Sequence, residues 1–201
     1  MLKKQIEAYV NLKIDTEGKG HPFELFKEEF NYVNKYNLLP NNDVNLNEID
    51  SSSRFDDAYI ERCDKETENV INEENSSFLD HPITYLKEHK NEFIYLESSW
   101  FDLIGVDAIS IEQDDVFGNY DVMLGLKLQK KMENELKKQL LLLMQEDESS
   151  FDVIFSHDDG LWNVNFSLND IKGFNEEMSI KDAYNLIYSS IFNLVEEIEK
   201  R

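Results

Sequence analysis

The clearest hydrophobic pattern lies near the end of the chain, where apolar residues recur every three or four positions. The stripe consists of Ile180, Ala183, Tyr184, Ile187, Ile191, Leu194, Val195 and Ile198. Such spacing gives an amphipathic helix one apolar face. Ser179 and Asp182 match a capping box, so we expect this helix to begin at residue 180. A shorter stripe formed by Leu2, Ile6, Tyr9 and Val10 predicts a first helix.

Alternation of apolar and polar residues predicts two strand pairs in the second half. Ile109 and Ile111 precede an acidic turn, and alternating apolar residues return from Tyr120 to Leu128. A helical stripe from Met132 to Met144 follows. The same order recurs, with alternation over 151–155, a turn, and alternation of Trp162, Val164, Phe166 and Leu168. We interpret this as a duplicated strand–strand–helix unit over 106–145 and 151–200, with all four of the last residues buried.

The first half has spacings that favour helices. Phe23, Phe26, Phe30 and Val33 form one stripe, and Phe55, Tyr59, Cys63 and Val70 form another. Ser53 with Asp56 resembles a capping box for the latter helix. Apolar residues over 83–103 suit a further helix, although residues 92–97 alternate imperfectly and also fit a strand.

These patterns predict an α+β fold. The expected architecture is a helical N-terminal region, 1–78, followed by an α+β domain, 79–201, or one continuous domain. The duplicated unit would form a four-stranded antiparallel sheet with helices on one face. The other face would then carry Asn163, Asn165 and Ser167, because antiparallel sheets commonly expose one side.

Charge narrows the choice of partner. The chain has 42 acidic and 20 basic residues in 201, giving a formal net charge of -22. Such a surface repels phosphate backbones and anionic membranes, so we expect neither direct nucleic-acid binding nor membrane association. It attracts a basic protein, and it also fits a simple role in solubility. A single cysteine, Cys63, excludes an intramolecular disulfide framework, and no signal or membrane segment is evident. We therefore expect a cytosolic protein.

Candidate chemistry is sparse. Clustered carboxylates and an imidazole are ligands for divalent cations, which makes Asp114, Asp115, His157, Asp158 and Asp159 candidates if the two acidic turns meet. Ordinary turn chemistry explains the same residues, because Asp-Gly is a favoured hairpin dipeptide. The sequence contains no nucleophile elbow, phosphate loop or dinucleotide glycine motif. We expect no cofactor, and Cys63 is interpreted as a small buried hydrophobe.

Four stretches carry a resemblance to a known family: RFDDAYIERCDKETE, SSFLDHPITYLKEHKNEFIYLESSWFDLIG, VFGNYDVMLGLKLQKK and DGLWNVNFSLNDIKGFNEEMSIKDAYNLIY. They resemble uncharacterised acidic cytosolic proteins of Bacillus-like Gram-positive bacteria, over most of the chain. Some members carry the label branched-chain aminotransferase. The residues argue against that activity, because neither a Schiff-base lysine nor a phosphate cup can be placed.

The sequence favours a non-catalytic, immunity-type or other acidic binding protein that engages a basic partner. Within the acidic segments 43–80 and 146–199, the expected contact residues are Asp56, Asp57, Glu61 and Asp64. Two alternatives remain open: a small metal-dependent hydrolase built on the turn carboxylates, and a nucleic-acid mimic. The oligomeric state is not determined by these patterns.

Overall fold

A seven-stranded antiparallel sheet forms the centre of the computed structural model, which describes residues 1–17, 23–39, 45–145 and 147–200. The strand order is β4-β3-β5-β6-β7-β9-β8. The strands are β3 (Tyr59–Asp64), β4 (Val70–Glu74), β5 (Glu92–Glu97), β6 (Val106–Gln113), β7 (Tyr120–Leu126), β8 (Phe151–Ser156) and β9 (Leu161–Ser167). Every pair of neighbours in this order is antiparallel.

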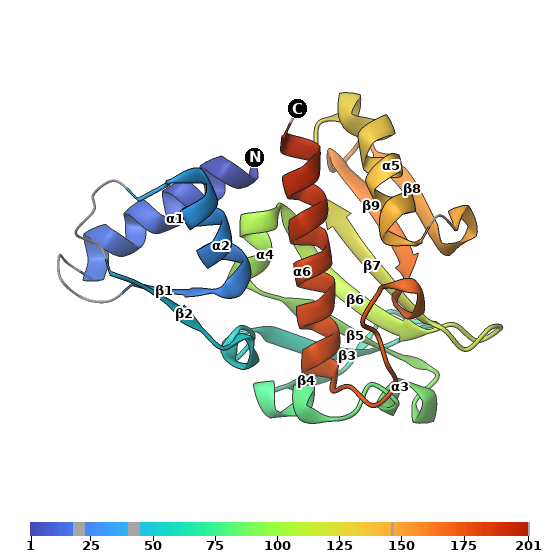
Figure 1. Cartoon of the computed structure of the whole chain (residues 1–201). Helices are drawn as coiled ribbons and strands as arrows, with labels where there is room; N and C mark the ends of the chain where they lie inside the picture. The colour runs from blue at the N-terminus through green and yellow to red at the C-terminus, as the bar shows by residue number, and fades with distance from the viewer. Residues whose placement is uncertain (18–22, 40–44, 146, 201) are drawn as a thin grey trace.

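One face of the sheet is covered by helices. The long helix α6 (Ile180–Glu199) lies across this face, with α5 (Glu133–Leu143) on one side of it and α1 (Leu2–Glu17) on the other (Figure 1). The capping box of Ser179 and Asp182 is confirmed. Ten residues of α6 are buried, and they include the whole predicted stripe. The apolar core therefore lies between α6 and the sheet.

An N-terminal unit flanks this core. It consists of α1, β1 (Phe23–Phe26), α2 (Lys27–Tyr36) and β2 (Leu46–Ile49), and β1 pairs with β2 in parallel. The short helix α4 (Ser99–Ile104) packs against α1. The remaining short elements are η1 (Ser51–Ser53), η2 (Ser76–Asp80), α3 (Tyr85–Glu88), η3 (Lys130–Met132), η4 (Glu148–Ser150) and η5 (Leu168–Asp170).

A buried ionic cluster joins this N-terminal unit to α6. Arg54 is 1% exposed, and its guanidinium donates to Glu29 Oε1 at 3.0 Å and to Glu28 Oε2 at 2.5 Å. Its carbon Cζ lies 3.9 Å from the centre of the Tyr188 ring on α6. The Tyr188 hydroxyl donates to Glu29, and the Ser189 hydroxyl donates to Glu28. The single guanidinium of Arg54 thus pairs with two carboxylates that are largely shielded from water.

The predicted four-stranded sheet with a duplicated unit is wrong. The sheet has seven strands, and the two supposed copies occupy unlike places in it. Strand β6 has neighbours on both sides, whereas β8 is an edge strand on which Ile154 is 60% exposed. Similar order of elements therefore does not make the two units structurally equivalent.

The helical character predicted for residues 1–78 holds for α1 and α2 but is wrong for residues 59–74. Residues 59–74 form β3 and β4, which belong to the main sheet, so the sheet runs across the expected boundary at residue 78. The error has a simple cause: Tyr59 and Cys63 are four residues apart, which places them on one face of a helix or of a strand. The stripe at residues 23–33 is divided as well, since β1 ends at Phe26 and α2 begins at Lys27.

Other predictions are confirmed. The helix at residue 2, the two strand pairs over 106–126 and 151–167, and the helix over 133–143 are all present. Of the two alternatives for residues 92–97, the strand is correct. Trp162, Val164, Phe166 and Leu168 are each at most 2% exposed, as predicted. None of the helices in the described part of the chain is long and apolar enough to cross a lipid bilayer.

Candidate functional site

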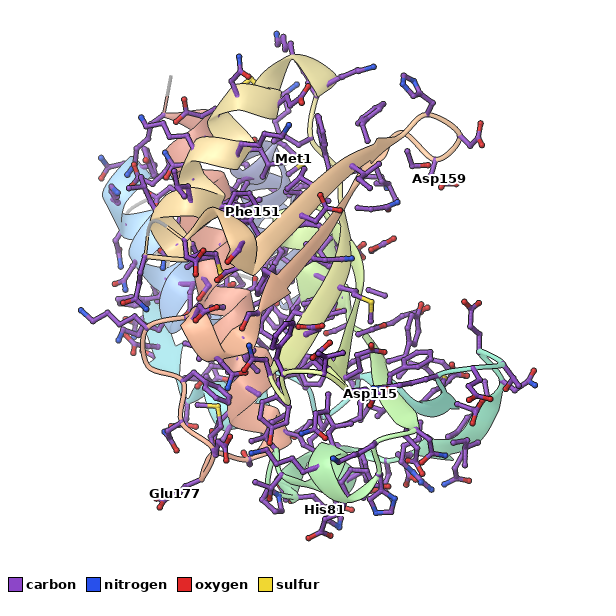
Figure 2. All side chains as sticks on the ribbon, turned by 90° about the vertical axis from the view of Figure 1, so that its right-hand side faces the viewer. Met1, His81, Asp115, Phe151, Asp159 and Glu177 are labelled. Carbon is purple, nitrogen blue, oxygen red and sulfur yellow. The ribbon has the colours of Figure 1, made fainter. Side chains whose placement is uncertain are left out.

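None of the helices in the described residues covers the face of the sheet opposite α6, and we call this face the open face. In Figure 2 the yellow helix α5 and the red helix α6 lie on the left, and this face points to the right. Alternation along β5 identifies it, because Ile94 and Leu96 are buried on the helical side while Phe93, Tyr95 and Glu97 alternate with them. By strand register, the side chains of the open face are those of Val70, Glu73, Tyr59, Glu61, Cys63, Phe93, Tyr95, Glu97, Ser110, Glu112, Asp121, Met123, Leu161, Asn163, Asn165, Ser167, Asp152, Ile154 and Ser156.

The charge of the open face has one sign. Its strands contribute seven carboxylates, and the six at paired strand positions come from Glu61, Glu73, Glu97, Glu112, Asp121 and Asp152. The only basic residue in the seven strands is Arg62, and it faces the helical side, where it pairs with Glu74 and Glu92. The seventh is Asp107, in the irregular first part of β6, which accepts from the backbone N–H of Gly125 at 2.9 Å. Gly125 allows this approach, because a Cβ there would lie 2.5 Å from Asp107 Oδ2.

Two pairs of these carboxylates lie directly across neighbouring strands. Glu61 is opposite Glu73, and Glu112 is opposite Asp121. Like charges in this position destabilise a sheet. Burial raises the pKa of Glu112, and Asp121 raises it further, while Lys65 lowers it. Burial likewise raises the pKa of Asp121, with a contribution from Asp114. The fold therefore keeps an unfavourable negative potential at this place.

Lys65 is the basic side chain that reaches this pair. Its ammonium lies 3.9 Å from Glu112 Oε1 and 3.7 Å from Asp115 Oδ1, and it also donates to the carbonyl of Gln113. One ammonium does not balance the four carboxylates of Glu112, Asp114, Asp115 and Asp121. A net negative charge remains at this end of the open face.

Aromatic and apolar side chains lie among the carboxylates. Phe93 and Tyr95 on β5 and Met123 on β7 are half-buried in the middle of the open face. The Tyr95 hydroxyl donates to Glu97, and burial with this bond raises the pKa of Tyr95. The Tyr59 hydroxyl donates to Glu61, which raises the pKa of Tyr59 to about 12. Both tyrosines therefore stay neutral and hold a carboxylate in place.

The opposite end of the open face has mixed charge. A hollow of about 940 Å³ begins at Tyr95, Glu97 and Asp107 and extends toward Lys127 and Lys131. The N-terminal amine of Met1, which also lines this hollow, pairs with Glu199. The uncompensated negative charge is thus concentrated toward the β6–β7 turn, away from the chain termini.

The structure does not bring the predicted metal ligands together. Asp114 and Asp115 lie in the turn that precedes β7, and His157, Asp158 and Asp159 lie in the turn that precedes β9. Because Asp121 pairs with Ser167 and Leu126 with Trp162, these turns are at opposite ends of the sheet. Figure 2 shows Asp115 and Asp159 far apart. Among the described residues, no three His, Cys, Asp or Glu side chains are arranged to hold a metal ion.

The four predicted contact residues do not share one surface. Glu61 lies on the open face, whereas Asp56 and Asp57 lie in the exposed turn before β3. Asp64 is on the other side of β3 and accepts from the Thr67 N–H at 2.9 Å and from the Thr67 hydroxyl at 2.8 Å. These bonds lower the pKa of Asp64 and close the β3–β4 turn. Asp64 therefore has a structural role.

Cys63 belongs to the open face but is 3% exposed. Burial raises the pKa of its thiol above the ordinary value of 9.0, and the Glu61 carboxylate adds to the shift. The thiol is therefore protonated at neutral pH, and a nucleophilic cysteine needs the opposite environment.

No protein-family model, curated protein or solved structure matches this chain. Sequence reasoning identified the sheet face at Asn163, Asn165 and Ser167 but missed its central members, among them Tyr95, Glu112, Asp121 and Met123. The signal was present, because Asp121 and Met123 are the residues that alternate with the apolar Tyr120, Val122 and Leu124. The polar half of a strand pattern thus marks the exposed surface as clearly as the apolar half marks the core.

Proposed function

We propose that the protein is a non-catalytic binding protein of immunity type, and that its open face engages a basic partner protein. The observation that carries the proposal is the one-sided charge of this face: its strands contribute seven carboxylates, which include two like-charged pairs, and no basic strand residue points to it. A cationic surface would relieve the repulsion within those pairs. Charge complementarity of this kind accelerates association and excludes acidic competitors.

The dimensions of the open face fit such a contact. Strands lie about 4.8 Å apart and rise about 3.4 Å per residue. Seven strands of the observed lengths therefore present a surface of about 500–800 Å², which is comparable to the roughly 800 Å² that each partner buries in a standard interface. Phe93, Tyr95 and Met123 supply aromatic and apolar contacts near the centre, where binding energy is usually concentrated.

A nucleic-acid mimic is a special case of the same proposal, in which the partner's basic surface normally binds nucleic acid. Rows of carboxylates across β4, β3, β5, β6 and β7 favour this case. Competition by duplex DNA for the partner distinguishes it from an immunity-type inhibitor of another kind. The hydrolase alternative has no comparable support, since its carboxylates lie at opposite ends of the sheet.

The proposal is tested by comparing two triple variants with equal charge. The first is Glu61→Gln, Glu73→Gln and Glu97→Gln on the open face. The second is Glu24→Gln, Glu48→Gln and Glu177→Gln, whose exposed side chains lie away from that face. A partner is captured from the source organism with the wild-type protein, purified, and its binding measured by surface plasmon resonance at about 50 mM and 500 mM salt.

We expect the open-face variant to bind at least tenfold more weakly, mainly through slower association, and the second variant to bind within about threefold of wild type. The wild-type affinity should fall steeply with salt, because exposed charges are screened over about 10 Å at 0.1 M. Equal weakening by both variants, or an affinity indifferent to salt, would show that the acidic open face is only a solubility device.

A further inference from the structure

Strand β8 forms the more regular of the two edges of the main sheet. It pairs with β9 in unbroken register over six residues, from Phe151 to Ser156, and none of the other described strands lies on its outer side. Figure 2 shows the molecule from this side, with the hairpin of β8 and β9 between the labels of Phe151 and Asp159. An unpaired edge is a template for another strand, and natural proteins usually protect it.

The opposite edge of the sheet, β4, is protected. This strand has five residues, and its register shifts opposite Arg62 and Cys63, which marks a β-bulge. It also carries two adjacent carboxylates, Glu73 and Glu74. Short strands, bulges and charged side chains all discourage edge pairing. Strand β8 has no bulge, proline or lysine, and its only charged side chain is that of Asp152. Strand β8 is therefore the better template.

The backbone groups that β8 turns outward are those of Phe151, Val153 and Phe155. Ser156 faces β9, because its carbonyl accepts from the Gly160 N–H at 3.0 Å in the turn that joins the two strands. Residues along an antiparallel strand alternate in the side to which they present their backbone groups, so every second residue from Phe151 faces away from β9. Val153 agrees with this alternation, since its N–H donates to the Asp152 carboxylate at 2.9 Å.

The edge of β8 is complementary to itself in one register. A two-fold axis at Val153 pairs all three outward residues, with Val153 opposite Val153 and Phe151 opposite Phe155 of the second copy. Asp152 then lies opposite Ile154 of the second copy, so no like charges meet within the strand pair. The three outward residues have half-buried side chains on the helical side, and the second copy would cover them further. Aromatic and β-branched pairs across strands stabilise a sheet.

The charge around β8 favours a second copy over a basic strand. Of the seven open-face strand carboxylates, only that of Asp152 lies on β8 or β9. Helix α5, which packs against β8, carries two lysines and two glutamates. This end of the sheet is therefore nearly neutral, although the whole chain has a net charge of -22. A basic strand would gain little attraction here, whereas a second copy would meet little local repulsion.

We propose that two copies of the chain pair through β8, antiparallel and about a two-fold axis at Val153. The seven strands of each copy would join into one continuous sheet, with both open faces on the same side. The contact is about 20 Å long, which is small for an interface, so the dimer should dissociate reversibly on dilution. This proposal does not depend on the proposed function, because the acidic part of the open face on β3–β7 stays uncovered.

Sedimentation equilibrium of the full-length protein tests the pairing. Measurements over about 1–200 µM protein, in about 0.3 M salt to screen the net charge, should show a monomer–dimer equilibrium. Ile154 is 60% exposed, so its substitution spares the core. By symmetry, Ile154→Glu places two carboxylates opposite Asp152 side chains, and Ile154→Lys places two ammonium groups there. We expect the Glu variant to dimerise at least about tenfold more weakly than the Lys variant.

The matched control makes the same two substitutions at Ile71 on β4, which is 45% exposed. These change the net charge equally but lie on the other edge, so their dissociation constants should differ by less than about threefold at this salt concentration. Hydrogen exchange followed by mass spectrometry provides a second measurement. Amides in the segment 151–156 should exchange more slowly at about 200 µM than at about 5 µM, because pairing protects the outward N–H groups.

Three results would overturn the proposal. The first is a protein that remains monomeric at about 200 µM in 0.3 M salt. The second is a dimer that responds more to the Ile71 pair than to the Ile154 pair, or equally to both Ile154 variants, because the edge or the register would then be wrong. The third is a dimer in which exchange of the segment 151–156 does not slow. Urea unfolding of each variant confirms that a lost dimer does not reflect a lost fold.

Discussion

Replacing Asp121 by asparagine should stabilise the folded protein. The side chain is half-buried on β7, lies directly across from Glu112 and is close enough to Asp114 for that carboxylate to raise its pKa. Asparagine has nearly the same shape, so packing is preserved while the repulsion is removed. An opposite pair of like charges costs roughly 0.2–1 kcal/mol, and burial of the charged form adds to this. We expect a gain of about 1 kcal/mol, which corresponds to about 2–4 °C in Tm for a chain of this size.

The pH dependence of this gain has a definite sign. The pKa of Asp121 in the folded protein is above its ordinary value of 3.8, so the folded state binds this proton more readily than the unfolded state. The wild-type protein therefore loses stability as the pH rises through the interval between 3.8 and the raised pKa. Asp121→Asn removes that loss. Its advantage over wild type should be full at pH 7 and should disappear below the ordinary pKa.

Urea unfolding at pH 7, in about 20 mM and 1 M salt, measures the effect. Asp158→Asn is the matched control, because it removes one negative charge from an exposed turn at the other end of the sheet. The gain of Asp121→Asn should be at least twice that of the control at low salt and should shrink at high salt. A variant less stable than wild type, or a gain equal to that of the control, would refute the idea that the open face holds uncompensated charge.

Three further predictions concern the core and the thiol. Arg54→Met should destabilise the fold by about 3–5 kcal/mol in urea unfolding, because Glu28 and Glu29 lose their cation. Adding Glu28→Gln and Glu29→Gln to this variant should restore more than half of the lost stability. Trp162→Ala should lower the free energy of unfolding by about 3–5 kcal/mol, since the residue is 2% exposed and its Nε1–H donates to the carbonyl of Leu128 at 3.1 Å. A loss below about 1 kcal/mol would contradict its place in the core. Cys63 should react with a disulfide reagent at pH 8 at least a hundredfold more slowly in the folded protein than in urea, and comparable rates would show that the thiol is exposed.

Local patterns predicted those elements whose two faces differ strongly. The helix from Ile180 has an apolar stripe and a capping box, and β9 alternates tryptophan, valine and phenylalanine with asparagine. A strong contrast between the two faces makes the repeat of the apolar residues clear, and this repeat distinguishes a helix from a strand. Where the spacing of apolar residues fits both a helix and a strand, the prediction fails: Tyr59 and Cys63 are four residues apart, and the helical interpretation of residues 53–70 placed β3 in the wrong class.

The order of the strands in the sheet could not be predicted from local sequence patterns, because it depends on pairing between segments that are distant in the chain. β3 and β4 join the later strands through the pairing of β3 with β5, over an intervening η2 and α3. The buried cluster was missed for the same reason, since Arg54, Glu29 and Tyr188 are brought together only by the docking of the N-terminal unit on α6. The acidic character was evident from the composition, but the gathering of Glu112, Asp114 and Asp121 depends on strand register.

The placement of charge in the main sheet supports the proposed binding role over a role in solubility alone. A solubility device needs net charge on exposed positions, and turns and helix surfaces provide many of these. Glu112 and Asp121 are instead half-buried and opposite each other, where they reduce stability without adding more solubility than an exposed carboxylate would. Natural proteins depart from local stability rules most often at functional sites. The substitution Asp121→Asn separates the two roles: if it stabilises the fold and weakens binding of a basic partner, the carboxylate is kept at a cost in stability because the contact needs it.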